Sequence, residues 1–83
     1  MYNKFFLHQI KHNTTNNNWD KGIVVKDTLD SAKQGYHAYL GAYAYGNNPD
    51  TDYVQCFVTD SFGAVISELK ETWIAPEQTN VAE

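Results

Sequence analysis

The sequence predicts an α+β fold, an antiparallel sheet of about four strands in the order β-β-α-β-β with one helix packed across it. Four short segments carry alternating or β-branched apolar residues between turn residues, as strands do. One longer segment, between the second and third of these, carries apolar residues at helical spacing. At 83 residues the chain holds one domain, which we expect to span residues 1–75, followed by a flexible polar tail at residues 76–83.

The first two strands are expected in the N-terminal third of the chain. Residues 4–11 read as a strand in which both faces carry apolar side chains, because Phe6 and Ile10 alternate with Phe5 and Leu7. Residues 13–18 are polar and without period, which predicts a loop. Residues 23–25 are β-branched and predict a short strand that pairs with the first one as a hairpin.

The helix is expected over residues 28–45. Asp27 or Thr28 can cap its start, and Gly46 suits a left-handed end. Spacing of 3-4-4-3 places one bulky stripe toward the sheet, formed by Leu29, Ala32, Tyr36, Leu40 and Tyr43.

The last two strands are expected at residues 52–59 and 64–73. The turn between them contains Gly63, which can supply a positive φ. With residues 58 and 65 opposite each other, the core face of this hairpin consists of Val54, Cys56, Val58, Val65 and Leu69.

Composition excludes several classes of function. Six basic against ten acidic residues give a net charge of −4, which disfavours binding of duplex nucleic acid. No apolar run approaches the ~20 residues of a membrane helix, and the N-terminus lacks a signal-peptide core, so we expect a cytoplasmic protein with no membrane association.

Neither catalysis nor metal binding is expected. Cys56 alternates with apolar residues, which predicts a buried structural thiol, and it is the only cysteine, so no intrachain disulfide forms. His8 and His12 would lie about 13 Å apart on a strand and read as surface histidines. We therefore expect no catalytic residue, no metal site and no cofactor, and a protein that is not an enzyme.

The helix carries the feature that points to binding. From Gln34 to Asn48 the chain has no formally charged residue, although a helix with one buried face normally presents charges on the other. We expect the following residues to form a contact surface for a second copy, giving a homo-oligomer, or for a partner protein: Gly35, Ala38, Tyr39, Ala42 and Tyr45. Two alternatives stay open, that the small residues pack on the sheet with the tyrosines pointing outward, and that the tyrosines stack on a nucleotide base.

The run from Tyr36 to Gly46, followed by residues 52–56, resembles small uncharacterised proteins encoded by phages and prophages of gut Firmicutes, over about residues 22–73. The resemblance implies a phage origin and a cytoplasmic location in the bacterial host cell, and it brings no functional residues with it. The expectation that follows is a non-catalytic, self-associating binding protein that inhibits a host defence factor. One alternative is a virion or tail accessory or assembly protein, and a second is a sponge for a small nucleotide signal.

Overall fold

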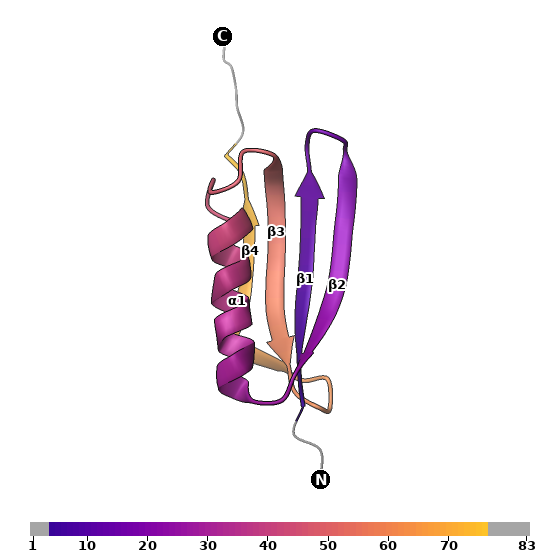
Figure 1. The fold of residues 1–83 in the computed structure, drawn as a ribbon, viewed down its shortest axis with the longest axis vertical. Helices are drawn as coiled ribbons and strands as arrows, with labels where there is room; N and C mark the ends of the chain where they lie inside the picture. Colours follow the sequence, from indigo (N-terminus) through magenta and orange to yellow (C-terminus); the bar gives the residue numbers. More distant parts are fainter. Residues whose placement is uncertain (1–3, 77–83) are drawn as a thin grey trace.

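The structure is a computed structural model that describes residues 4–76, and it confirms the predicted α+β fold. Its strands form one antiparallel sheet in the order β2-β1-β3-β4, with the helix α1 between β2 and β3 in the chain (Figure 1). The bounds are β1 Phe5–Asn13, β2 Asn18–Lys26, α1 Leu29–Tyr43, β3 Thr51–Thr59 and β4 Val65–Ile74.

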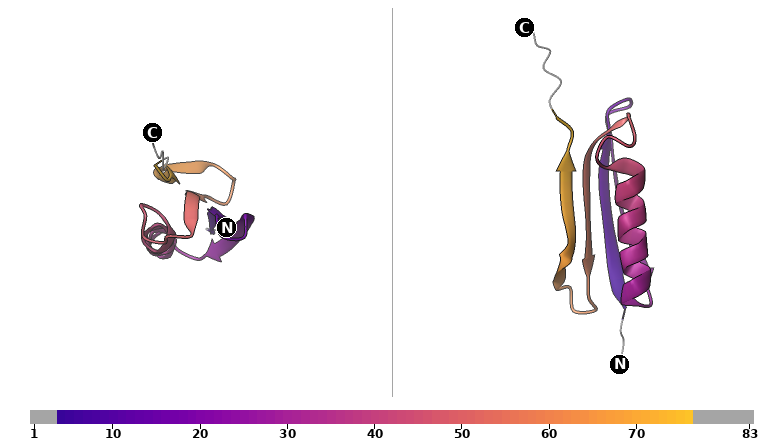
Figure 2. Two further views of the ribbon diagram at one scale, coloured as in Figure 1. Left: turned by 90° about the horizontal axis from the view of Figure 1, so that it is seen from above. Right: turned by 90° about the vertical axis from the view of Figure 1, so that its left-hand side faces the viewer.

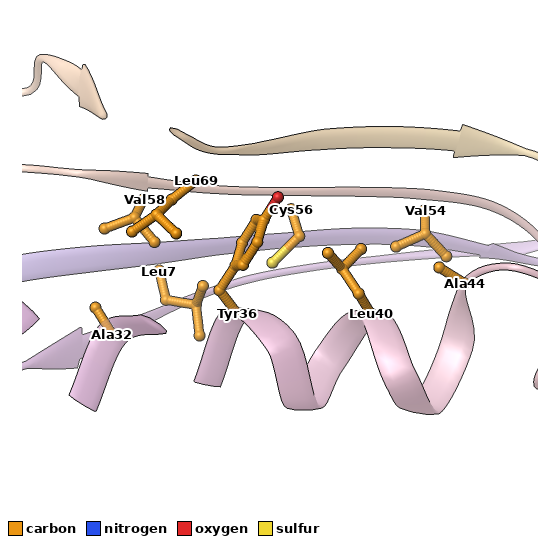
Figure 3. Packing of buried hydrophobic residues seen from close by; sticks show 9 residues of the cluster. All are labelled: Leu7, Ala32, Tyr36, Leu40, Ala44, Val54, Cys56, Val58 and Leu69. Carbon is orange, nitrogen blue, oxygen red and sulfur yellow. The ribbon is translucent and has the colours of Figure 1, made fainter. Parts of the chain in front are cut away.

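The helix α1 lies on one face of the sheet, over β3 and β1 more than over β2 (Figure 2). Successive side chains of a strand point to opposite faces, so alternate residues of β1 and β3 meet the helix. The core lies between these two layers, and it consists of Leu7, Val54, Cys56, Val58 and Leu69 from the sheet and Ala32, Tyr36, Leu40 and Ala44 from the helix segment (Figure 3).

The ends of α1 follow from local chemistry. Thr28, one of the two predicted caps, is the N-cap, and its side chain accepts a hydrogen bond from the backbone N–H of Ser31 at 3.1 Å. The helix ends at Tyr43, earlier than the predicted residue 45. Ala44 is already extended, and the left-handed turn begins at Tyr45 (φ 60°) before Gly46 (φ 80°) continues it.

The β1–β2 hairpin is longer than predicted. β2 starts at Asn18 rather than at residue 23, which leaves a loop of residues 14–17. The Asn13 side chain accepts hydrogen bonds from the backbone of Thr15 at 2.8 Å and of Asn16 at 3.3 Å. Thr14 N–H in turn donates to the carbonyl of Asp50 at 2.8 Å. The loop is therefore tied to the turn that precedes β3.

The predicted register of the β3–β4 hairpin is wrong at its turn end. Val65 pairs with Thr59 instead of Val58, and the register shifts between Phe57 and Thr59. Extra residues in β4 then turn Ile66 toward the core and leave Val65 46% exposed, because one bulge exchanges the faces of the strand. The other predicted core residues of this hairpin are buried.

Candidate interaction surface

The sheet has a second face, which α1 does not cover, and we call it the open face. It follows from the alternation of the strands, because Leu7 and Val58 face the helix and their neighbours face away. Its apolar and aromatic side chains include Phe6, His8, Ile10 and Phe57 on the two central strands, and Ile23 and Ile74 on the edge strands.

Apolar side chains on the open face are exposed to solvent. Ile74 is 66% exposed and Ile23 is 60% exposed, and Val25 lies beside Ile23 on the same strand face. A contiguous apolar patch on a protein surface commonly marks a site of interaction with another protein or a ligand. The open face is therefore the leading candidate for a binding surface.

Ring contacts between strands fix the aromatic part of the open face. The rings of His8 on β1 and Phe57 on β3 are stacked, with centroids 4.4 Å apart and planes at 7°. Near the β1–β2 loop, Trp19 contacts both His12 and Tyr53, with centroids 4.8 Å and 5.4 Å away. Such cross-strand pairs stabilise a sheet, and here they also hold the rings in place without a covering layer.

Two hollows flank His8 on the open face. One, of about 540 Å³, lies toward the β2 edge and is lined by His8, Ile10, Lys21, Gly22 and Ile23. The other, of about 530 Å³, lies toward the β3–β4 turn, where Phe62 is almost fully exposed. Both are lined mainly by apolar atoms, so they suit apolar side chains of a partner rather than a charged ligand.

The two histidines of β1 have opposite electrostatic settings. His8 Nε2 lies 3.1 Å from Thr59 Oγ1, and burial lowers the pKa of the ring. His12 Nδ1 lies 2.7 Å from Asp52 Oδ1 and its Nε2 lies 2.8 Å from Asn17 Oδ1. Its pKa is raised, first by the hydrogen bond with Asp52 and then by the one with Asn17. His8 therefore behaves as a neutral aromatic residue, and His12 favours the charged form.

The structure separates the five residues that the sequence placed on a helical interface. Ala38 and Ala42 are exposed on the outer side of α1. Gly35 faces the sheet instead, since a Cβ added there would lie 2.8 Å from Leu7 Cδ2. The small residues are thus divided between an outward pair and one close contact within the chain.

The two tyrosines of that predicted interface also differ. Tyr39 is half-buried beside the core, and burial raises its pKa. Tyr45 lies beyond the end of α1, is 54% exposed, and has its ring centroid 6.4 Å from that of Trp73. A left-handed backbone is costly for tyrosine. The role of these residues as an interface stays a prediction.

The cysteine of this chain is part of the core. Cys56 is buried, as predicted, and burial raises the pKa of its thiol to about 12. Within residues 4–76, no three His, Cys, Asp or Glu side chains gather as a metal site requires. The same residues contain no helix with the length and apolar character needed to cross a bilayer.

Sequence reasoning missed the open face, although a signal for it was present. β1 carries apolar residues on both sides, Phe5 and Leu7 on one and Phe6 and Ile10 on the other. This pattern is typical of a strand whose two faces are both buried. A single helix covers only one side.

Comparisons with family models, with curated proteins and with solved structures give no match for this chain.

Proposed function

We propose that this chain is a non-catalytic binding protein that docks its open face on an apolar surface of a partner protein. The observation that carries the proposal is the row of apolar and aromatic side chains on the side of the sheet away from α1, with Ile23 and Ile74 more than half exposed. Covering such a face removes apolar surface from water, at about 25 cal/mol per Å².

The charges at the margin of the open face indicate the chemistry of the partner. Lys21 lines the hollow beside His8, and Lys70 lies opposite Phe57 on β4. An apolar patch with lysines beside it fits an apolar surface that carries carboxylates at its rim. The proposed partner is a protein of that kind.

The chemistry of the polar groups supports binding rather than catalysis. A nucleophilic cysteine needs a low pKa and solvent access, whereas Cys56 is fully buried with a pKa of about 12. Within residues 4–76, His8 stacks on Phe57 and contacts a threonine hydroxyl, rather than a carboxylate that would orient it as a base.

The expected biological setting remains that of a phage-encoded inhibitor acting in the cytoplasm of a bacterial host. An inhibitor of a host defence factor needs a surface that occupies its target, and the open face supplies one without any reaction. A virion or tail accessory protein would use the same face toward another virion protein.

The test compares charge substitutions on two surfaces. Val65→Glu/Ile74→Glu places carboxylates on exposed positions of the open face, and Ala42→Glu places one on the outer side of α1. Each variant is expressed with an affinity tag in a gut Firmicute, its fold is checked by circular dichroism, and captured proteins are identified by mass spectrometry.

The proposal expects a partner that wild type and Ala42→Glu capture and that Val65→Glu/Ile74→Glu loses. Loss with Ala42→Glu alone would instead favour the helical surface predicted from the sequence. Equal capture by all three proteins, or capture by none, counts against docking through the open face.

A further inference from the structure

The outer edge of β2 is a second exposed surface, separate from the open face. β2 is nine residues long and ends the sheet on one side. Its register with β1 runs from Asn18 to Lys26 without a shift, and every residue from Asn18 to Val25 is exposed. A long, regular edge strand presents unpaired N–H and C=O groups that can pair with another strand.

The other edge of the same sheet is protected. β4 contains the register shift beside Thr59, and the strand carries three charged residues, Glu68, Lys70 and Glu71. Bulges and charges are the features that keep edge strands from pairing. β2 also carries three charged residues, Asp20, Lys21 and Lys26, but it has no register shift, and its charges flank an uncharged middle, residues 22–25.

We propose that β2 pairs antiparallel with β2 of a second copy of this chain, giving a two-fold dimer with one continuous eight-stranded sheet. A two-fold axis makes the surface self-complementary, so one segment is enough to build the interface. Side chains keep their faces across such a pair, which brings the two open faces together as one larger surface.

Charge complementarity selects the register. With Ile23 on the two-fold axis, Gly22 lies opposite Val24 and Asp20 lies opposite Lys26 of the second copy, and symmetry repeats each pair. With Gly22 on the axis, Asp20 would meet Val24 instead. Opposite charges placed directly across a pair of strands stabilise it. Asp20 also accepts a bond from Lys11 in its own chain, and a carboxylate can accept several.

The register makes a sharp prediction for disulfide cross-linking. In Ile23→Cys the two thiols face each other across the axis, with Cα atoms about 5 Å apart. In Gly22→Cys and Val24→Cys the like residues are diagonal, about 7–8 Å apart, beyond the reach of a disulfide. The native Cys56 gives a silent background, because it is fully buried and its pKa is about 12.

We expect Ile23→Cys to form a covalent dimer under mild oxidation, while Gly22→Cys, Val24→Cys and the edge control Ser67→Cys on β4 stay single chains on a non-reducing gel. A covalent dimer from Ser67→Cys but not from Ile23→Cys would overturn the proposal. Faster cross-linking at position 22 or 24 would overturn the register.

A charge exchange supplies an independent readout. Light scattering over a range of concentrations should give twice the monomer mass of 9.5 kDa for wild type. Asp20→Lys and Lys26→Asp should each raise the dissociation constant about tenfold, and the double variant should restore it, because it re-forms both pairs. Glu71→Lys on β4 should change nothing. A wild-type chain that stays monomeric at every concentration would overturn the dimer.

These outcomes are separable from those of the proposed function. Asp20 and Lys26 share the helix-covered side of β2, whereas the proposed docking surface lies on the other side. If the chain dimerises but captures no partner protein, the β2 dimer is supported and the proposed function is not. If the chain is monomeric but captures a partner protein, the proposed function is supported and the dimer is not.

Discussion

Two strands of this small sheet, β3 and β2, are built in contrasting ways. β3 lies between two strands and under the helix, and its alternate residues Val54, Cys56 and Val58 are fully buried. β2 has a partner on one side only and is exposed along nearly its whole length, although residues 23–25 are as apolar as those of β3. The apolar residues of β3 are buried in the core, whereas those of β2 stay exposed, and this exposure is the basis of the proposed dimer.

The largest difference should appear between truncations in the buried core and on the exposed strand β2. Leu7→Ala removes a side chain that is 1% exposed in the core, and we expect it to lower the free energy of unfolding by about 2–5 kcal/mol. Ile23→Ala removes an exposed side chain, and we expect less than about 1 kcal/mol.

Urea denaturation at the lowest usable protein concentration measures both values, since a dimer would add to the apparent stability. Equal losses from Leu7→Ala and Ile23→Ala would mean that the β2 edge belongs to the folding core after all.

The two histidines of β1, His8 and His12, should make contributions to folding stability that depend on pH in opposite ways. The pKa of His12 is raised in the folded chain, so its contact with Asp52 stabilises the fold at acid pH, below the ordinary value of about 6.5. That stabilisation is lost as pH rises through the higher pKa of the folded state. The pKa of His8 is lowered, so His8 favours the folded state at neutral pH, and this contribution is lost as pH falls.

An NMR titration of the ring protons should therefore place His12 above and His8 below the ordinary histidine pKa. His12→Gln should cost stability at pH 5.5 and little at pH 8, and His8→Gln should show the reverse trend. Coincident titration of the two rings would refute the assigned contacts.

Much of the fold could be predicted from the sequence, because the decisive patterns are local. Of the predicted stripe, Ala32, Tyr36 and Leu40 are buried, whereas Leu29 is exposed. The helix starts at one of the two predicted caps, Thr28. The full length of β2 could not be predicted, since residues 18–22 gain their extended form by pairing with β1 and carry no alternation of their own.

The bulge in β4 and the identity of the uncovered edge of the sheet were also beyond local patterns. Nothing near Val65 in the sequence indicates that the register shifts, because the shift depends on how β4 meets β3. The lack of charge on the helix predicted one interface that included Gly35, Ala38 and Ala42. In the structure Gly35 instead faces the sheet, in close contact with Leu7. Only the arrangement of strands revealed which face and which edge are left uncovered.

Amide hydrogen exchange at two protein concentrations tests the central claim, that β2 is the part of the sheet left for another molecule. The account predicts that amides of residues 18–26 exchange more slowly at high concentration, as their N–H groups find partners on a second copy, while those of residues 65–74 on β4 are unchanged. Exchange in β2 that is independent of concentration, or equal slowing on both edges, would contradict it.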